Sequence, residues 1–238
     1  MKPLDFDHYA LAPERLAGLN AQLAPLSAGE RIEWALANLP GTHVLSSSFG
    51  AQAAVSLHMA VQRSADIPVV LVDTGYLFPQ TLDFVRELRE RLHLNLHVYR
   101  AAQSPEAMEA QHGQLWTQGR EAIRLYNRIR KVEPMQRALA ELGAGTWITG
   151  IRRQQSESRA QIDFLSLRDG CFKLHPLADW RDLDIWTYLK THDLPYHPLW
   201  HEGYLSIGDT HSTTRWSEGM REEDTRFQGL VRECGLHA

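Results

Sequence analysis

A cysteine close to the end of the chain is the first residue whose type and place suggest chemistry. Cys234 lies four residues before Ala238, in the segment RECGLHA, and the only other cysteine is Cys171. Chain ends are ordinarily the loosest part of a domain, and a loose thiol can act as a nucleophile that meets two partners in turn. The position of Cys234 alone is also consistent with a cysteine that has no chemical role. Cys171, within GCFKLHP, is expected to be a buried strand residue of no chemical consequence.

Residues 46–50 (SSSFG) form a turn of small residues that could bind an anion. Between a strand and a helix, backbone N–H groups and the helix dipole favour negative charge, and the hydroxyls of Ser46, Ser47 and Ser48 add donors. No GK[ST] follows and the pattern is not GxGxxG, so this is neither a Walker A loop nor a dinucleotide fingerprint. An ordinary turn capped by serine fits the spacing equally well.

Asp73 and Thr74 follow the apolar run IPVVLV and precede Gly75. A carboxylate at that place can accept a hydrogen bond from a ribose or a base, and a turn-forming Asx residue is the alternative. The binding role is favoured, because the neighbouring loop is already a candidate ligand site.

Basic residues gather where strands and helices begin or end, although the net charge of the chain is −4. Such clustering favours a multiply charged anion such as a nucleotide phosphate, and solvated surface charge is the alternative. The residues are Arg130, Lys131, Arg152, Arg153 and Arg159.

The histidines do not predict a metal site. Four of them, His192, His197, His201 and His211, fall in one region of the sequence. No HExxH or comparable tight pair occurs among them, and zinc sites usually contain one.

The segments that carry these residues alternate between strand and helix patterns. Residues 1–40 are expected to be helical, with a break near Pro25 and a stop at the Pro40-Gly41 turn. Strands are expected at residues 42–46, 67–72, 95–100 and 146–152, and helices at 51–63, 80–92, 132–143 and 180–194. Residues 101–130 are expected to be a polar helical excursion over the sheet. Leu82, Val85, Leu88 and Leu92 recur at helical spacing.

This alternation predicts an α/β fold with a mostly parallel twisted sheet and helices on both faces. Ligands of such sheets bind at the carboxyl ends of the strands. The loops at residues 46–50, 73–75 and 151–159 should therefore converge on one crevice. Residues 1–215 are expected to form a nucleotide-binding domain, and residues 216–238 a mobile C-terminal tail.

Composition limits the class of protein. With 43% hydrophobic and 23% charged residues, the chain is typical of a globular protein. Its acidic balance argues against a general nucleic-acid or membrane binder. The N-terminus carries acids and prolines in place of an apolar signal region, and no run reaches the roughly 18 apolar residues of a membrane span. Two cysteines do not form a disulfide framework, so a cytoplasmic location is expected.

Taken together, these stretches resemble the 3′-phosphoadenylyl sulfate (PAPS) reductases of sulfate assimilation. The resemblance runs from about residue 42 to the end, through SSSFGAQAAVSLH, LVDTGYLFPQT, RKVEPM, TGIRRQQSESRA, YHPLWHEGYLSIGDTHST and RECGLH. It implies an adenine-nucleotide α-hydrolase-like fold with a modified pyrophosphatase (PP) loop, usually in a homodimer. It also implies that PAPS is reduced to sulfite and adenosine 3′,5′-bisphosphate by reduced thioredoxin or glutaredoxin.

The resemblance assigns roles to individual residues. Cys234 would be the nucleophile that becomes an S-sulfonate. On physical grounds and apart from the resemblance, surrounding cations such as His237 are hypothesised to raise the thiolate fraction of Cys234 above that of a free thiol with a pKa of about 8.5. Cations would stabilise the charge that develops on the leaving phosphate. The residues expected to hold the substrate are Ser47, Ser48, Phe49 and Gly50 at the phosphosulfate, Asp73 and Thr74 at the adenosine, and Arg130, Lys131, Arg152, Arg153 and Arg159 at the phosphates with Gln154 and Ser156 beside them. Gly75, Gly150 and His237 are also expected among the substrate-binding residues.

Two departures separate the chain from related classes. Relatives that reduce adenylyl sulfate (APS) commonly carry a four-iron cluster on a CC pair and a CxxC pair, which needs four ligands. Here Tyr126 and Asn127 replace the first pair, and Asp209 and Ser212 the second, so no iron–sulfur cluster and no metal is expected. A cluster-free APS reductase remains an alternative.

The other alternative is a PP-loop ATP pyrophosphatase or nucleotidyl ligase. Such enzymes favour SGGxDS, in which the Asp helps to place magnesium, whereas Gln52 stands at that position in this chain. A subunit that only binds nucleotide is a further class, but it would leave Cys234 unexplained.

Overall fold

The fold is built on one six-stranded sheet. The computed structural model describes residues 4–10 and 13–230 of the chain. The strand order is β3-β2-β1-β4-β6-β5, and all neighbours are parallel except β5, which runs antiparallel to β6. The strands are β1 (Thr42–Ser46), β2 (Pro68–Val72), β3 (Asn95–Tyr99), β4 (Ala144–Thr149), β5 (Leu165–Arg168) and β6 (Cys171–Leu174).

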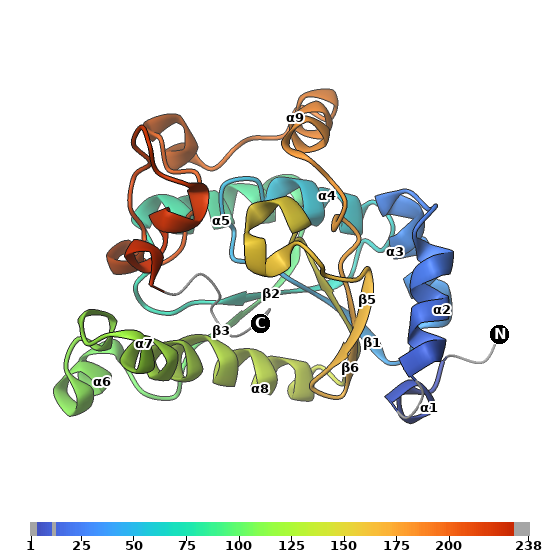
Figure 1. The fold of residues 1–238 in the computed structure, drawn as a ribbon, viewed down its shortest axis with the longest axis horizontal. Helices are drawn as coiled ribbons and strands as arrows, with labels where there is room; N and C mark the ends of the chain where they lie inside the picture. The colour runs from blue at the N-terminus through green and yellow to red at the C-terminus, as the bar shows by residue number, and fades with distance from the viewer. Residues whose placement is uncertain (1–3, 11–12, 231–238) are drawn as a thin grey trace.

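Helices cover both faces of this sheet. In Figure 1, α4 and α5 lie on one face, and α7 and α8 lie on the other. The helices are α1 (Phe6–Ala10), α2 (Pro13–Leu23), α3 (Ala28–Asn38), α4 (Ala54–Val61), α5 (Pro79–Leu92), α6 (Pro105–His112), α7 (Arg120–Asn127), α8 (Glu133–Glu141) and α9 (Asp182–Thr191). A π-helical turn, η2 (Arg128–Val132), joins α7 to α8. Together these elements confirm the predicted α/β class.

Alternation along each strand divides the core between the two faces. Leu45 and Leu71 pack with the cluster under α3, α4 and α5, whereas Val44, Val70 and Trp147 pack against α8. All five side chains are at most 2% exposed. Burying one such apolar side chain contributes about 1.5–3 kcal/mol, so both faces of the strands hold the helices in place.

The predicted breaks and turns occur where the sequence indicated. Helix α2 ends at Leu23, and α3 begins after Ser27, which forms a capping box with Glu30. Gly41 has a φ of +68°, and a Cβ on it would lie 2.5 Å from the amide nitrogen of Gly145. This close approach lets the chain turn from α3 into β1 beside β4.

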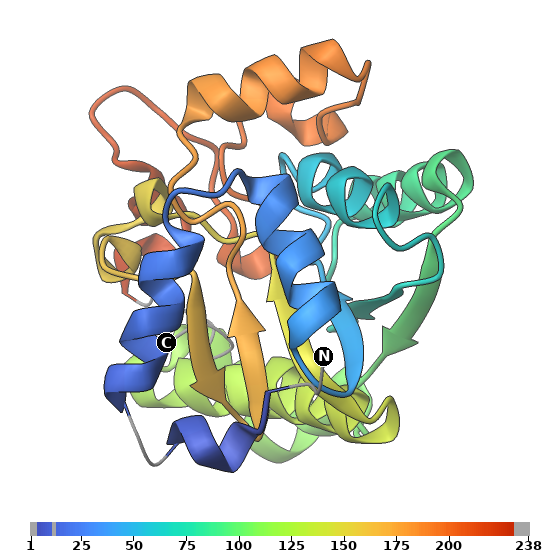
Figure 2. The same cartoon turned by 90° about the vertical axis from the view of Figure 1, so that its right-hand side faces the viewer.

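Three features differ from the sequence-based expectations. Of the β5–β6 hairpin only the strand around Cys171 was expected; β5 and the pairing were not predicted, because strands of four residues are short. Figure 2 shows the hairpin beside the N-terminal helices in blue. Leu82 is 42% exposed and lies outside the buried stripe of α5, in which Phe84 takes part. The fourth strand ends at Thr149, so Gly150 begins the following loop.

The strand order sets the place where a ligand is expected. From β1 the chain moves outward through β2 to β3, and then returns to β4 on the other side of β1. The carboxyl ends of β1 and β4 therefore form the switch point at which open α/β sheets bind ligands. Within the described part of the chain, no helix is long and apolar enough to cross a membrane.

Candidate active site

The loop after β1 is shaped by its own serines. The Ser47 amide donates to the Val70 carbonyl at 3.0 Å, and the Ser47 hydroxyl accepts from the Phe49 amide at 3.1 Å. Phe49 is fully buried with a φ of +50°, which holds the turn in a conformation that few non-glycine residues adopt. Ser48 is exposed. Buried Phe49 thus anchors the loop, while Ser48 remains open to a ligand.

The loop after β4 lies against the loop after β1. Gly150 approaches α4 so closely that a Cβ on it would lie 2.8 Å from the Ser56 hydroxyl. Arg152 is 4% exposed and donates to Gln52 Oε1 at 2.9 Å and to Asp182 Oδ1 at 2.8 Å. We call Arg152, Gln52 and Asp182 the Arg152 cluster. It joins the loops after β1 and β4 to the start of α9.

The rest of the loop after β4 consists of two short 3-10 turns, η3 (Arg153–Gln155) and η4 (Glu157–Arg159). Arg153 donates to the Ile162 carbonyl at 2.9 Å, and Arg159 donates to Gln155 Oε1 at 2.7 Å. Gln154 accepts from the Asp182 amide at 3.1 Å. The predicted polar residues therefore lie one after another along this loop, and side-chain hydrogen bonds hold the loop in place.

Ser156 lies between these two turns. Its side chain is buried, and its hydroxyl lies 2.9 Å from that of Ser158. Its backbone is extended, so it separates η3 from η4.

In the loop after β2, Asp73 forms the Asx turn that was the alternative to a ligand-binding role, and it also pairs with an arginine. Asp73 Oδ1 accepts from the Gly75 amide at 2.9 Å, as in an Asx turn, and Oδ2 accepts from Arg100 Nε at 2.8 Å. Arg130 is 2% exposed and donates to the carbonyls of Thr74, from Nε at 2.8 Å, and of Gln103, at 2.6 Å. Its guanidinium therefore supports the loop through backbone acceptors.

A buried carboxylate lies beside this loop. Asp209 is 1% exposed; its Oδ1 accepts from the Thr74 hydroxyl at 2.5 Å, and its Oδ2 from the Tyr126 hydroxyl at 2.9 Å. Lys131 Nζ lies 2.7 Å from the same Oδ2. We call Asp209, Thr74, Tyr126 and Lys131 the Asp209 cluster. Three segments that are far apart in the sequence meet on this one carboxylate.

Electrostatics keep this carboxylate ionised. Burial alone would raise the pKa of Asp209, but the ammonium of Lys131 and the hydrogen bonds of Lys131 and Thr74 hold that pKa well below its usual range. Burial, followed by the charge of Asp209, raises the pKa of Tyr126 far above its ordinary value, so this phenol donates and stays neutral. The cluster therefore contains a fixed negative charge paired with the Lys131 cation.

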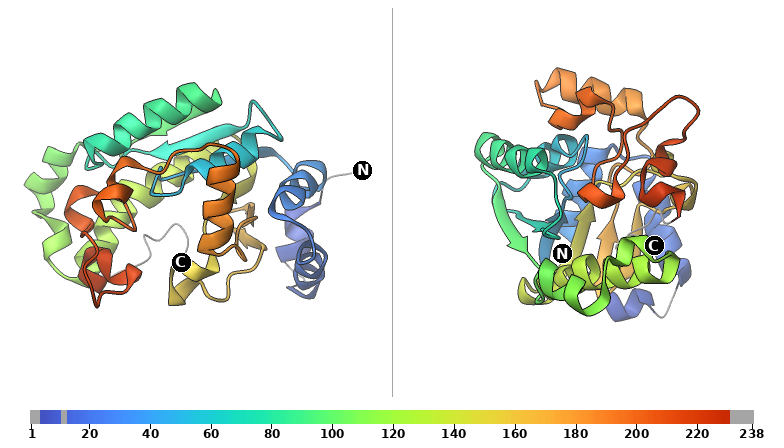
Figure 3. Two further views of the ribbon diagram at one scale, coloured as in Figure 1. Left: turned by 90° about the horizontal axis from the view of Figure 1, so that it is seen from above. Right: turned by 90° about the vertical axis from the view of Figure 1, so that its left-hand side faces the viewer.

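The segment that carries Asp209 brings the loops after β1 and β2 together. A Cβ on Gly50 would lie 3.5 Å from the Ile207 carbonyl, and two residues later Asp209 pairs by a backbone bridge with Leu77. Figure 3 shows this C-terminal segment in red beside α7 in green. The predicted convergence of the loops after β1, β2 and β4 is therefore present in the fold.

Several residues of the site were missed from the sequence. Asp209 and Tyr126 were identified only as substitutes for cluster cysteines, and Lys173 was not considered. Lys173 is 2% exposed, and its Nζ lies 3.9 Å from the centre of the Trp147 ring. Trp147 Nε1 donates to the Ser46 hydroxyl at 2.7 Å. The signal that could have identified Lys173 is its place inside the otherwise apolar strand sequence CFKL, because a buried charge requires a partner.

The positions compared with cluster cysteines lie close together. The Tyr126–Asp209 hydrogen bond joins the two pairs, and Ser212 donates to the Asp209 carbonyl at 3.2 Å. Asn127 Oδ1 is buried, with no hydrogen-bond partner among the residues described. The side chains at these positions are hydroxyl, amide and carboxylate groups, which do not match the thiolates that such clusters use.

Buried histidines of this region are neutral. Burial lowers the pKa of His197 and of His211 to about 4 and that of His175 to about 3. His211 stacks on Trp116 with 3.9 Å between ring centres. In the described part of the chain, no group of three or more His, Cys, Asp or Glu side chains could hold a metal ion.

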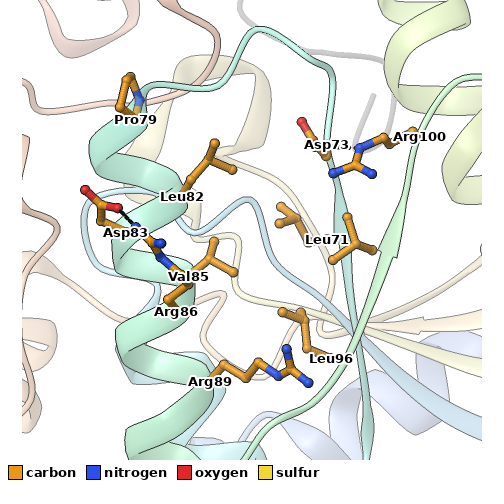
Figure 4. Close-up of a pocket in the computed structure, with 11 residues that line it drawn as sticks. Leu71, Asp73, Pro79, Leu82, Asp83, Val85, Arg86, Arg89, Leu96 and Arg100 are labelled. Atoms are coloured by element: carbon orange, nitrogen blue, oxygen red, sulfur yellow. Dashed lines mark hydrogen bonds and ion pairs between the residues drawn. The ribbon is translucent and has the colours of Figure 1, made fainter. Parts of the chain in front are cut away.

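Two hollows border the site. A groove of about 490 Å³ lies between α5 and strands β2 and β3, and Asp73 and Arg100 close one end of it (Figure 4). A second hollow of about 530 Å³ is lined by Arg120, Ser158 and Leu230, among others. The second one therefore lies where the described chain ends.

The predicted nucleophile, Cys234, belongs to the last eight residues of the chain. Cys234 and His237 lie outside the described residues, which end at Leu230. Of the expected tail, Thr225, Arg226 and Phe227 are buried. Cys171, by contrast, is a buried strand residue whose thiol donates to the Ala144 carbonyl at 3.0 Å, as expected.

Comparisons with known proteins point to one family. A model of the phosphoadenosine phosphosulfate reductase domain matches residues 42–215. The phosphoadenosine 5′-phosphosulfate reductase of Pectobacterium atrosepticum is 59% identical over 222 residues, which cover 93% of this chain and 91% of that protein.

Solved structures agree with this match. A phosphate complex of the phosphoadenylyl-sulfate reductase from Candida auris superposes with a TM-score of 0.74 at 31% identity, over 90% of this chain and 100% of the other. FMN adenylyltransferase from Candida glabrata shares the fold alone, with a TM-score of 0.55 at 16% identity over 76% of this chain and 58% of that one.

Proposed function

Because the chain belongs to the phosphoadenosine phosphosulfate reductase family, we propose that it reduces PAPS to sulfite and adenosine 3′,5′-bisphosphate. The observation that carries the proposal is the meeting of the loops after β1, β2 and β4 at the switch point of the sheet, with Arg152 on one side and Lys131 on the other. The predicted substrate residues belong to these loops or to the turns beside them. The phosphate complex of the Candida auris relative agrees with an anion site in this fold.

The proposed reaction has two steps. In the first, the Cys234 thiolate attacks the sulfate sulfur, an S–S bond forms, and the bond from sulfur to the phosphate oxygen breaks. Adenosine 3′,5′-bisphosphate leaves with the electron pair of that bond, and Cys234 becomes an S-sulfonate. Donors near the leaving phosphate, among them Ser48 and the cations of the loop after β4, would stabilise its developing charge.

In the second step a protein dithiol supplies two electrons. One thiolate of reduced thioredoxin or glutaredoxin attacks the Cys234 sulfur and displaces sulfite, which leaves a mixed disulfide. The second thiol of the donor resolves this disulfide, so that Cys234 returns as a thiol and the donor is oxidised. A thiol near the chain end suits the exchange, because it has to meet a small nucleotide and then a protein. His237, three residues further on, would raise the thiolate fraction.

The side chains at the positions compared with cluster cysteines favour the branch of the family that uses PAPS and has no iron–sulfur cluster. Tyr126, Asn127, Asp209 and Ser212 offer no thiolate at the compared positions, and the Tyr126 and Asp209 side chains are bound to one another at 2.9 Å. We expect the protein to act without iron or any other metal. Cluster-free reduction of APS is the alternative within the family.

An ATP pyrophosphatase is disfavoured by Gln52. The Gln52 side chain accepts from the Arg152 guanidinium at 2.9 Å, so an amide and an arginine stand where those enzymes place a carboxylate for magnesium. The protein is further proposed to act in the cytoplasm, in assimilatory sulfate reduction, as a homodimer.

A substrate comparison tests the proposal. The protein would be incubated with reduced thioredoxin and either PAPS or APS, and sulfite and the nucleotide product would be measured, with Cys234→Ser as the control. We expect equal amounts of sulfite and adenosine 3′,5′-bisphosphate from PAPS, none from APS, and none from the control. Sulfite from APS alone would overturn the substrate assignment, and cleavage of ATP to AMP and pyrophosphate would favour the ligase class.

A further inference from the structure

The segment before the tail is fastened to the site through Asp209. The side chain of Asp209 accepts hydrogen bonds from Thr74 and Tyr126 and pairs with Lys131. Its backbone is fixed as well, because Asp209 pairs with Leu77 and the amide of the next residue donates to the Tyr76 carbonyl at 2.9 Å. This segment therefore keeps a fixed place beside the loop after β2.

Arg226 fastens the following segment to the one that carries Asp209. Its Nη1 donates to the Thr213 hydroxyl at 2.9 Å and its Nη2 to the Ser212 hydroxyl at 3.2 Å. The backbones of Thr213 and Arg226 form an antiparallel bridge, and the Thr214 amide donates to the Thr225 carbonyl at 2.9 Å. We call this set of contacts the Arg226 clamp.

The Arg226 clamp depends on a glycine. A Cβ on Gly208 would lie 2.1 Å from both terminal nitrogens of the Arg226 guanidinium. The Gly208 amide donates to the same Thr213 hydroxyl at 3.1 Å. Side chains larger than hydrogen at position 208 would therefore push the guanidinium away from its two hydroxyl acceptors.

The Arg226 clamp lies close to the end of the described chain, and only buried Phe227 and the short turn η8 (Phe227–Gly229) follow it before Leu230. Cys234 is eight positions after Arg226, and an extended chain spans at most about 3.3–3.6 Å per residue. The thiol can therefore lie no more than about 26–29 Å from Arg226. A short tether of this kind gives a group an effective concentration in the range of about 1 mM or more near its target.

We propose that the Arg226 clamp, supported by the Asp209 cluster, is a positioning device. It holds the segment around Arg226 beside the nucleotide site, so that Cys234, eight positions later, reaches the sulfate. The inference rests on the proposed function and adds Gly208, Asp209 and Arg226 as positioning residues. Asp209 links the two ends of the device, because its carboxylate contacts the loop after β2 while its segment holds the clamp. Sulfonation should therefore depend on the clamp more than nucleotide binding does.

The test uses Gly208→Ala in the full-length protein. Reduced protein is mixed with saturating PAPS in the absence of any donor, and S-sulfonation is followed by quenching and intact mass. The dissociation constant of adenosine 3′,5′-bisphosphate and the unfolding midpoint are measured in parallel. Because a small misplacement of a reacting group can cost about 10²-fold in rate, we expect sulfonation to slow by about that factor while the dissociation constant stays unchanged.

Matched variants separate positioning from stability. Gly18→Ala is the control for the substitution itself, because no atom outside the backbone of its own helix lies within 4 Å of the new Cβ. In Gly208→Ala/Arg226→Ala the new Cβ has room, so the unfolding midpoint should recover while sulfonation stays slow. Arg226→Lys, which keeps the charge but loses the paired hydroxyl contacts, should slow sulfonation with a folded protein.

Each outcome decides one point. A sulfonation rate in Gly208→Ala equal to that of the unmodified protein would overturn the inference and leave the proposed function intact. A loss of nucleotide affinity as large as the loss of rate would also overturn it, because the clamp would then belong to nucleotide binding. An unmodified protein that binds PAPS and forms no S-sulfonate would overturn the proposed function and this inference with it.

Discussion

The Arg152 cluster and the Asp209 cluster contain similar groups and hold them in different surroundings. In the Arg152 cluster the guanidinium is buried, but its partner Asp182 has a side chain that is 61% exposed. In the Asp209 cluster both partners are buried, with side-chain exposures of 10% for Lys131 and 1% for Asp209. A solvated carboxylate can give up its cationic partner to a ligand anion and return to water at low cost, whereas a buried one cannot.

This difference separates two tasks within one site. The Arg152 cluster can release its cation toward a phosphate, because Asp182 loses little when it returns to water. The Asp209 cluster keeps its contacts, because both charges are buried, and it therefore holds the loop after β2, the end of α7 and the C-terminal segment together. Four substitutions or titrations would test the distinction, and the first has the largest expected effect.

Asp209→Asn should destabilise the fold most. It leaves the buried ammonium of Lys131 without a counter-charge, and breaking a buried pair in this way costs about 3–5 kcal/mol. The free energy of unfolding from urea titration measures the effect. A loss below about 1 kcal/mol, the range of an exposed pair, would show that the Asp209 cluster is no more rigid than the Arg152 cluster.

Gly150→Ala should have the next largest effect on stability, because it crowds the loop that carries Arg152. The added Cβ would lie 2.8 Å from the Ser56 hydroxyl and 3.0 Å from Ser56 Cβ. Overpacking of this kind costs about 1–3 kcal/mol and would displace the loop that carries Arg152. Calorimetry of adenosine 3′,5′-bisphosphate should show weaker binding, and adding Ser56→Ala should recover part of it. Unchanged affinity in the single variant would mean that this loop does not shape the site.

Lowering the pH should first destabilise the protein because buried neutral histidines resist protonation, and only at lower pH should the contribution of Asp209 be lost. Burial, then the charges of Lys173 and Arg159, lowers the pKa of His175 to about 3. The unfolded chain takes up a proton near pH 6.5, so this stability is complete above about pH 6.5 and is lost as the pH falls toward 3. The slope is about 1.4 kcal/mol per pH unit for one proton.

His175→Asn isolates this contribution. Urea titrations between about pH 6 and pH 4 should have a slope that is smaller by about one proton than that of the unmodified protein. Asp209, whose pKa is lowered, keeps its contribution over that interval and loses it only below the ordinary carboxyl pKa of about 4. An unchanged slope in His175→Asn would mean that this histidine is protonated in the fold.

Asp182→Asn should have the smallest effect. Its side chain is 61% exposed, so the change in unfolding free energy should stay within about 0–1 kcal/mol. Nucleotide affinity should rise slightly, because Arg152 loses a competing anion. A large loss of stability, comparable with that in Asp209→Asn, would remove the contrast between the two clusters.

The sequence predicted the Arg152 side of the site better than the Asp209 side. Strands β1 and β2 carry runs of apolar residues bounded by small or polar turns, so the loops that follow them could be located from periodicity. The loop at residues 151–159 was predicted to follow a strand, which places Arg152 and Ser156 near the switch point, whereas Gly150 was expected within that strand. The contacts of Arg152 with Gln52 and Asp182 cross about 100 and 30 residues, and no local pattern encodes such pairs.

On the Asp209 side only Thr74 and Lys131 were predicted as site residues, and the carboxylate that joins them could not be derived from local patterns. Residues 195–230 form short 3-10 turns without hydrophobic periodicity, so their path depends on contacts with distant segments. The Asp209 carboxylate meets a hydroxyl 135 residues away. Strand β5 and its pairing with β6 were missed for a related reason: strands of four residues are too short for alternation to be recognised.

The central claim is that the site joined by these two clusters serves a thiol on the C-terminal tail. The most direct test is the intact mass of the reduced protein after mixing with PAPS or with APS in the absence of thioredoxin, with Cys234→Ser in parallel. The account predicts the gain of one SO₃ with PAPS alone and no gain in the variant. No adduct with either nucleotide, although the nucleotide binds, would contradict it.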